Sequence, residues 1–376
     1  MIFFLATTKL TGLSDQTQIF LPRLTVIALF ALAATTSAAE TPSNHLVVLQ
    51  YHHVSTSTPT STSITPDQFA AHMHWLADNE YTVVALPEAL RKVRDGEPLT
   101  DKTVAITFDD GYKDNYTNAL PILREHGWPF TVFVNPEPHD QKLTGWASWK
   151  ELREMAKYGA SIANHTSSHL FMLRRLPEET TVEWRTRLTR EIVIAEERIY
   201  EETDQTHRIL AYPYGESNIA IRAVIADLGF IGFGQQSGAI DADSDFTDLP
   251  RFPLSGPYSA MDSFQTKMKS LPMPVFNATP DSASHDGILT FAETRPALTL
   301  QLHDSSRLVL NCFASGQGTI PVIDQDNGRY LIRAPEPLPV GRSRYNCTYA
   351  SEWPGRYYWY SYAWVRRDEG DTWTHN

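Results

Sequence analysis

The chain has few cysteines and few positive charges for its length. Only two of its 376 residues are cysteine, and they do not have the spacing of a zinc site, which argues against thiolate metal ligation. The 32 lysines and arginines are outnumbered by 44 aspartates and glutamates, which gives a formal net charge of -12. Nucleic acids and anionic lipids attract basic surfaces, so this charge argues against both as partners. It does not argue against a neutral polysaccharide, or one that becomes cationic.

Long apolar runs are scarce, and the main one lies near the N-terminus. The run at 24–34 (LTVIALFALAA) follows Arg23 and is succeeded by small residues up to Glu40, which are the parts of a secretory signal peptide. The run is short for a helix that spans a membrane. We therefore expect residues 1–39 to be a signal peptide and the protein to be exported, either to the periplasm or out of the cell. An uncleaved N-terminal membrane tether is the alternative.

The two cysteines, Cys312 and Cys347, both lie late in the chain. In an exported protein, two cysteines within one small domain favour a disulfide. Two buried free thiols are the alternative.

Residues 46–275 alternate short apolar segments with segments of helical periodicity. Continuous apolar runs such as 103–108 (TVAITF) are typical of strands that are buried on both faces. The alternation predicts an α/β fold, a distorted (β/α) barrel of about seven units with helices packed outside parallel strands. In such folds the chemistry gathers at the carboxyl ends of the strands. The expected strands are 46–51, 81–86, 103–108, 130–134, 161–163, 208–212 and 230–233.

The composition changes after residue 275. Residues 272–288 are rich in Pro, Ser and Asp, which predicts a linker, placed at 276–288, between an α/β domain at 40–275 and whatever follows. Short strand-like segments separated by turn residues then predict a small all-β, sandwich-like domain at 289–376. Its last strand places four aromatic side chains on one face, which would form either a carbohydrate platform or the core of the sandwich, and we favour the core. These side chains are Tyr358, Tyr360, Tyr362 and Trp364.

Three polar clusters each follow an expected strand: 107–111 (TFDDG), 165–169 (HTSSH) and 211–215 (AYPYG). Two histidines four residues apart share one face if the segment is helical. Two imidazoles and one carboxylate leave a coordination position open, which suits a catalytic divalent metal, with zinc as the default. Of two adjacent aspartates, one can bind the metal and the other can act as general base for a water that the metal activates. Each cluster alone is typical of a turn or a surface helix, but their order after successive strands points to one site.

In these motifs the sequence resembles the polysaccharide deacetylases of carbohydrate esterase family 4, also called the NodB-homology family. The resemblance covers about residues 46–275, and TFDDG and HTSSH are its specific parts. It implies that Asp109 is the general base and that the backbone N–H of Tyr214 stabilises the tetrahedral oxyanion, with Pro213 fixing that loop. The implied metal ligands are Asp110, His165 and His169.

The resemblance also suggests a substrate groove. Aromatic faces suit sugar rings, and Trp146 and Trp149 are the candidates to line such a groove. Ordinary core packing is an equal alternative for both side chains.

The sequence departs from the family pattern in two places. Many members have an arginine that orients the base aspartate where this chain has Ala211, and Arg251 is the candidate to supply that charge. Many members also have a late Leu-His pair whose histidine is the general acid. The pair at 302–303 lies in the expected β domain, so we interpret it as a coincidence. His52 or His53 is the better candidate for a proton donor or substrate contact, with a structural histidine as the alternative, and the general acid stays unassigned.

The predicted function is metal-dependent removal of acetyl groups from an N-acetylated polysaccharide. A β-linked N-acetylglucosamine polymer is the expected substrate, because the start at 50–52 (QYH) and the AYPYG form resemble the exported enzymes that act on poly-N-acetylglucosamine. Two alternatives stay open: an O-acetyl esterase on xylan or a similar glycan that uses the same site, and a carbohydrate-binding protein with a weakened site. No protein partner is predicted.

Overall fold

The computed structural model describes residues 44–370 and 372, apart from 284 and 304–307. The predicted signal peptide at 1–39 lies outside the described residues and stays a prediction. Within the described part of the chain, no helix combines the length and the apolar character that crossing a membrane requires.

The first region of the chain is built on a parallel β-sheet with the strand order β10-β1-β5-β6-β7-β8-β9, and β4 pairs with β5. The strands are β1 (Val47–Tyr51), β4 (Thr82–Val83), β5 (Thr103–Phe108), β6 (Phe130–Val134), β7 (Ala160–Asn164), β8 (Ile209–Ala211), β9 (Ile231–Phe233) and β10 (Phe252–Pro253). All seven predicted strands are present, and they form an open, distorted barrel as predicted. The short strand β10 was not predicted, because two residues carry no periodicity.

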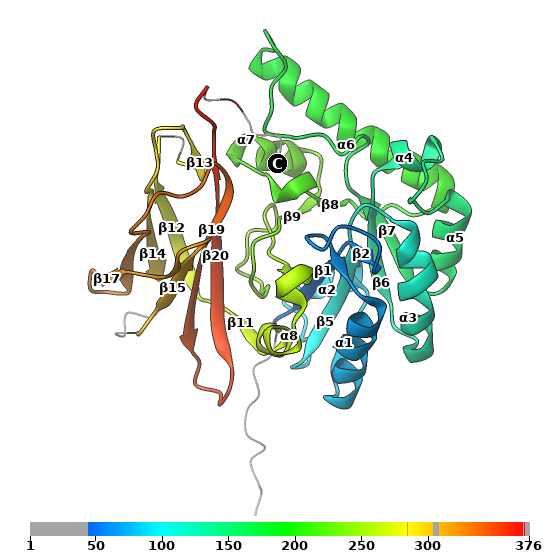
Figure 1. Ribbon diagram of the computed structural model, residues 1–376, viewed down its shortest axis with the longest axis horizontal. Helices are drawn as coiled ribbons and strands as arrows, with labels where there is room; N and C mark the ends of the chain where they lie inside the picture. The colour runs from blue at the N-terminus through cyan, green and yellow to red at the C-terminus, as the bar shows by residue number, and fades with distance from the viewer. Residues whose placement is uncertain (1–43, 284, 304–307, 371, 373–376) are drawn as a thin grey trace, which may run out of the picture. The chain divides into compact units, whose positions relative to one another are not determined.

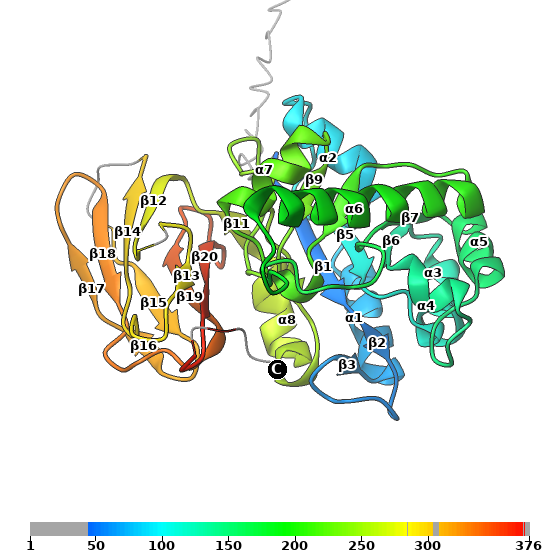
Figure 2. The same ribbon diagram turned by 90° about the horizontal axis from the view of Figure 1, so that it is seen from above.

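Eight helices lie in this region of the described chain: α1 (Pro66–Asp78), α2 (Leu86–Arg94), α3 (Leu120–His126), α4 (Pro136–Asp140), α5 (Trp149–Lys157), α6 (Thr181–Thr203), α7 (Ile219–Asp227) and α8 (Met261–Met268). Helices α1, α3, α5 and α6 lie along the outside of the sheet (Figures 1 and 2). Thr65 forms a capping box at the start of α1, and Ser148 forms one at the start of α5. The strands are mostly apolar because both faces of the sheet are covered, and all six residues of β5 are buried.

The chain then forms two further sheets. One has the order β12-β14-β18-β17 and the other the order β11-β20-β19-β15-β16, with β13 paired to β20. The first sheet contains β12 (Val275–Asp281), β14 (Ala297–Leu302), β17 (Val322–Asp324) and β18 (Arg329–Arg333). The second contains β11 (Ser270–Pro272), β13 (Ile288–Leu289), β15 (Asn311–Ala314), β16 (Gly318–Ile320), β19 (Gly341–Ala350) and β20 (Tyr357–Arg366). A separate small sheet joins β2 (His53–Val54) and β3 (Ser63–Ile64).

The segment predicted as a linker is partly a strand. Residues 275–281 form β12, which pairs antiparallel with β14. Pro280, the proline within this strand, is tolerated because β12 is an edge strand, where a missing N–H costs little. Strand β11 lies within the bounds predicted for the α/β domain, 40–275, but it pairs with β20 of the later region. The division of the chain into an α/β domain and a β domain near residue 275 stays a proposal.

The aromatic face of β20 is part of the core of the β-rich region, as favoured from the sequence. Trp364 is fully buried, and Tyr358, Tyr360 and Tyr362 pack against the same apolar cluster. This cluster also contains Leu298, Tyr330 and Tyr345.

The predicted disulfide is present between Cys312 on β15 and Cys347 on β19. These residues lie directly opposite each other in the antiparallel pair. Cross-linking positions that are 35 residues apart restricts the unfolded chain, which typically stabilises a domain by about 2–4 kcal/mol. We expect the double variant Cys312→Ala, Cys347→Ala to unfold at a lower urea concentration. The same midpoint with and without the bond would contradict this.

Candidate active site

Three segments with polar side chains meet at one edge of the parallel sheet. His52 follows β1, Asp109 and Asp110 follow β5, and His165 follows β7. Neighbouring strands of this sheet run parallel, so their carboxyl ends lie at the same edge. The predicted site is thus assembled where the strand pattern indicated.

The three predicted metal ligands lie together. Oδ1 of Asp110 is 3.3 Å from Nε2 of His165 and 3.3 Å from Nε2 of His169. The ligand atoms of all three residues lie within 4.8 Å of one another.

The two histidines are brought together by a loop and not by a helix, so the expected helical spacing is not the reason for their proximity. The segment after β7 turns through Thr166 (φ 61°) and His169 (φ 56°), both in the left-handed region. The first motif turns in the same way at Asp110 (φ 71°) and Gly111 (φ 66°). Only glycine fits at position 111, because a Cβ there would lie 2.9 Å from the His139 ring.

The protonation of this cluster suits a divalent cation. Nδ1 of His165 is 2.8 Å from the carbonyl of Ala211 and donates its proton there, which leaves Nε2 free as a ligand. Burial, followed by the nearby His165, lowers the pKa of His169 to about 4, so its ring is neutral at pH 7. Burial alone would raise the pKa of Asp110, but His165 outweighs it and keeps the carboxylate ionised. Burial would lower the pKa of His165, but Asp110 and Asp109 outweigh it and raise this pKa, so the ring releases a proton when a cation binds. The ligand set is then two neutral imidazoles and one carboxylate, which zinc accepts.

The Asp109 carboxylate is completely buried and held on both oxygens. Arg251 donates to Oδ1 at 2.6 Å and to Oδ2 at 2.9 Å, and Gln50 donates to Oδ2 at 2.7 Å. Burial alone would raise the pKa of Asp109, but Arg251 and then His52 outweigh it and lower the pKa to about 2. Asp109 is therefore ionised at neutral pH in a fixed orientation.

Arg251 reaches Asp109 from the unpredicted strand β10. It directly precedes Phe252, which lies opposite Leu49 of β1, and its side chain is fully buried. Arg251 also donates to Thr107 Oγ1 and to the carbonyl of Gly234, so its position is determined by several contacts. Arg251, the residue named as the candidate from the sequence, thus places its guanidinium against the Asp109 carboxylate.

Gln50 was not assigned a role from the sequence. Its signal is a single amide side chain inside the otherwise apolar strand β1 (VVLQY). A buried amide needs a hydrogen-bond partner, and here the partner is Asp109.

The two adjacent histidines after β1 differ in their surroundings. Nε2 of His52 is 3.7 Å from Oδ2 of Asp109, and the side chain is 19% exposed, so it faces the site and solvent. Asn115 holds the backbone of His52 by donating to its carbonyl at 2.6 Å. His53 is 2.7 Å from Asp114 and stacks on the Tyr112 ring. Of the two, His52 is the one that lies beside the Asp109 carboxylate.

The third motif forms a tight turn beside the metal ligands. Pro213 is buried at the start of this turn, so it supports the loop and does not line a groove. Tyr214 adopts φ 61°, and its ring lies 4.6 Å from that of His169 and stacks at 3.9 Å on Phe171. From the β-rich region, Arg342 donates to the carbonyl of Tyr214 at 3.1 Å and lies over its ring.

The two tryptophans proposed to line a groove, Trp146 and Trp149, lie in different surroundings. Trp149 is 9% exposed, belongs to the core of the barrel and donates its indole N–H to Asp140, so the groove assignment was wrong for this residue. Its position in the first turn of α5, on the face toward the sheet, is the reason. Trp146 is partly exposed and contacts Tyr112 (centroids 5.4 Å apart).

His303 packs against Phe276 of the β-rich region. This agrees with the interpretation that the Leu-His pair at 302–303 matches the family motif by coincidence.

Arg342 gives a test of whether the β-rich region affects the site. We expect Arg342→Ala to lower kcat by about fivefold to tenfold, the effect of one lost hydrogen bond to the loop that carries Tyr214. KM and metal content should change little. Arg342→Lys, which keeps the charge, should recover part of the rate, and Arg329→Ala on β18 is the matched control. A wild-type kcat in Arg342→Ala would show that this contact is irrelevant to the site.

The chain resembles known proteins in this region. The family model described as "Polysaccharide deacetylase" matches residues 96–232. The Bacillus subtilis (strain 168) protein YxkH, whose name places it among the polysaccharide deacetylases, is 30% identical over 214 residues, which are 56% of this chain and 71% of that protein. The poly-beta-1,6-N-acetyl-D-glucosamine N-deacetylase of Escherichia coli (strain K12) is 28% identical over 251 residues, which are 56% of this chain and 36% of that enzyme. The match therefore spans about a third of the length of the E. coli relative.

The fold has solved counterparts. The Streptococcus pyogenes deacetylase PplD, solved in complex with acetate, superposes with a TM-score of 0.54 at 22% identity. The superposition covers 60% of this chain and 99% of that chain. At this identity the likeness supports the fold alone.

Proposed function

The chain belongs to the polysaccharide deacetylase family, and we propose that it hydrolyses the N-acetyl groups of a polysaccharide, a β-linked N-acetylglucosamine polymer. The observation that carries the proposal is a buried, ionised aspartate beside a cluster of one carboxylate and two imidazoles. The name of the E. coli relative supports the choice of polymer.

Asp110, His165 and His169 would hold a divalent cation, with zinc proposed. The cation would supply Lewis acidity toward water and the amide carbonyl. The residues support this role by their own geometry: a hydrogen bond to Ala211 fixes the ring of His165, and His169 is neutral. Metal dependence is thus proposed from the ligand set.

Asp109 is proposed as the group that accepts a proton from the attacking water. Its carboxylate is ionised and is oriented by Arg251 and Gln50. His52, next to it and partly exposed, is proposed to give a proton to the leaving amine. The backbone N–H of Tyr214 is proposed to stabilise the negative charge on the carbonyl oxygen, and Trp146 to contact a sugar ring at the rim.

The proposed substrate and the N-terminal sequence both favour export of the protein. A polysaccharide of this kind lies outside the cytoplasm, and the apolar run at 24–34 has the pattern of a signal peptide. We propose a periplasmic or extracellular location, with residues 40–275 as the catalytic domain. The disulfide between Cys312 and Cys347 agrees with an oxidising compartment.

The test is acetate release from two substrates by the full chain. We expect release from a four-sugar β-1,6-linked N-acetylglucosamine oligomer, loss of activity with a chelator, and recovery on adding Zn²⁺. Release from acetylxylan alone would replace the proposal with the O-acetyl esterase. Binding of the oligomer without release in the presence of added metal would replace it with the carbohydrate-binding protein.

A further inference from the structure

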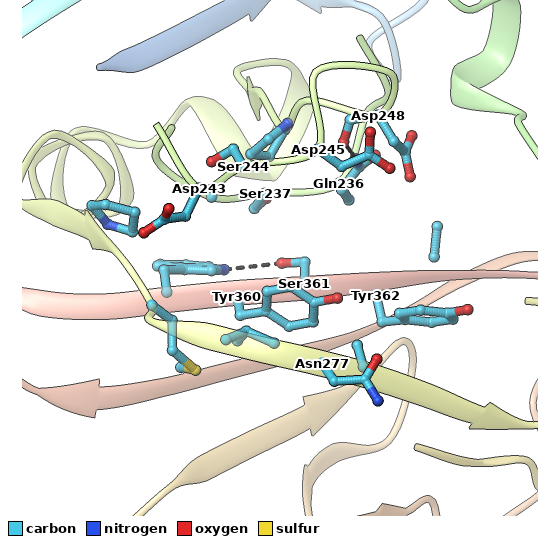
Figure 3. Close-up of a pocket in the computed structure, with 18 of the residues that line it drawn as sticks. Gln236, Ser237, Asp243, Ser244, Asp245, Asp248, Asn277, Tyr360, Ser361 and Tyr362 are labelled. Carbon is cyan, nitrogen blue, oxygen red and sulfur yellow. Dashed lines mark hydrogen bonds between the residues drawn. The ribbon is translucent and has the colours of Figure 1, made fainter. Parts of the chain in front are cut away.

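The protein has a second cavity apart from the candidate active site. It has a volume of about 570 Å³, which is within the range of small-molecule and sugar sites. It lies between the loop that follows β9 and strands β12 and β20 (Figure 3). Among the described residues that line it, none is a proposed metal ligand, and neither Asp109 nor Tyr214 takes part.

One wall of this cavity is aromatic. Trp359 lines it from one face of β20, Tyr360 and Tyr362 line it from the other face, and Phe276 lines it from β12. Tyr360 and Tyr362 also pack on the core of the β-rich region, and the Trp359 indole donates to Ser361, so these three rings are held in place. Phe276 is 68% exposed, an unusual exposure for a phenylalanine in a strand. Fixed aromatic faces with polar edges are what a sugar ring stacks on.

The opposite wall is acidic. Figure 3 shows Asp243, Asp245 and Asp248 along the loop on one side, and Tyr360 and Tyr362 along the strand on the other. Asp241 and Asp286 also line the cavity.

The chain neutralises only part of this charge. Arg222 is 3.0 Å from Asp248 and 3.7 Å from Asp245. Among the described residues that line the cavity, it is the only lysine or arginine. Burial raises the pKa of Asp248 despite Arg222, and burial also raises the pKa of Asp241. Five carboxylates facing one guanidinium leave a site that favours a cation.

We propose that this cavity is a second glycan site, which binds the amine-bearing stretches of a partly deacetylated polymer. The inference rests on the proposed function, because hydrolysis of an N-acetyl group leaves a primary amine that is protonated at neutral pH. The aromatic wall stacks on the sugar rings, and the aspartates bind the ammonium groups. Acetylated sugars are neutral and gain nothing from the acidic wall, so the cavity distinguishes product from substrate.

The cavity is connected to the active site through one loop. The residues from 236 to 250 lead directly into Arg251, whose backbone N–H donates to the carbonyl of Gln236 at 2.9 Å. Ser217, which also lines the cavity, lies three residues after Tyr214. A polymer whose converted part is held here keeps its unconverted part near the active site, so successive acetyl groups are removed without release of the chain.

The test compares two probes on the full chain by calorimetric titration: a four-sugar β-1,6-linked glucosamine oligomer and its fully acetylated form. We expect the double variant Asp243→Asn, Asp245→Asn to bind the glucosamine oligomer about tenfold more weakly than the wild type, the loss of a charged hydrogen bond. Phe276→Ala should also weaken it, and Asp227→Asn on α7 is the matched charge control. Binding of the acetylated oligomer should be unchanged in the double aspartate variant and in Asp227→Asn, because its sugars carry no ammonium group.

The outcomes separate this inference from the proposed function. Equal affinity of wild type and both cavity variants for the glucosamine oligomer would overturn the second site, even if acetate release is normal. Absence of acetate release in the wild type would overturn the proposed function, while the titration would still decide what the cavity binds. If the inference holds, the variants keep the wild-type rate on a four-sugar substrate and release polymer chains from which fewer acetyl groups have been removed.

Discussion

Asp109→Asn is expected to keep its metal and to lose at least about 10²-fold in acetate release. Asparagine has nearly the same shape, so the cluster of Asp110 and the two histidines stays intact. It cannot accept a proton, and general acid–base groups contribute about 10²–10⁴-fold in rate. Metal content by mass spectrometry and acetate release on the same preparation are the two measurements.

The neighbouring variant Asp110→Asn is expected to fail differently. It exchanges an anionic ligand for a neutral one, so metal affinity should fall together with rate, and added metal should restore part of the activity. The same excess of metal should do nothing for Asp109→Asn. Asp140→Asn, a surface aspartate paired with Arg198, is the control for the substitution itself. Rescue of Asp109→Asn but not of Asp110→Asn would reverse the two roles, and full activity in both would remove the basis for a deacetylase.

The sequence predicted the barrel because its strands are covered on both faces and therefore appear as uninterrupted apolar runs. The segment TVAITF became β5 with the predicted bounds, and the alternation of such runs with helical periodicity determined a parallel sheet. The position of Asp109 and Asp110 followed, because both come directly after that strand. The features that follow from a regular sequence pattern, the strands and the residues directly after them, were therefore predictable.

The parts that were not predictable depend on contacts between distant residues. The pairing of Arg251 with Asp109 joins positions 142 residues apart, and no local pattern marks it. Arg251 was named as the candidate only because the family resemblance implies an arginine beside the base aspartate. Strand β12 was mistaken for linker because prolines on an edge strand resemble those of a loop. Trp149 was an equal candidate for groove and core, and only its packing against the barrel decided between them. The turns that bring His165 to His169 rely on left-handed residues other than glycine, which composition does not reveal.

Arg251→Gln is expected to reduce both stability and activity, because it leaves a fully buried carboxylate without its cation. Breaking a buried ion pair by removing one partner typically costs about 3–5 kcal/mol. The pair here qualifies, since both side chains are 0% exposed and two hydrogen bonds join them. The Asp109 carboxylate would also lose its fixed orientation, so acetate release should fall even in the fraction that remains folded. Urea unfolding and acetate release are the measurements.

A second substitution separates the structural role of Arg251 from its role in the reaction. In the double variant Asp109→Asn, Arg251→Gln no carboxylate is left unpaired, so much of the lost stability should return while activity stays at the level of Asp109→Asn. Arg187→Gln on α6, which breaks the more exposed pair with Glu179, should cost only about 0–1 kcal/mol and leave the rate unchanged. If Arg251→Gln is as stable and as active as the wild type, the guanidinium neither compensates nor orients the aspartate. If the double variant is no more stable than Arg251→Gln, the lost stability comes from the contacts of Arg251 with Thr107 and Gly234 instead of from the buried charge.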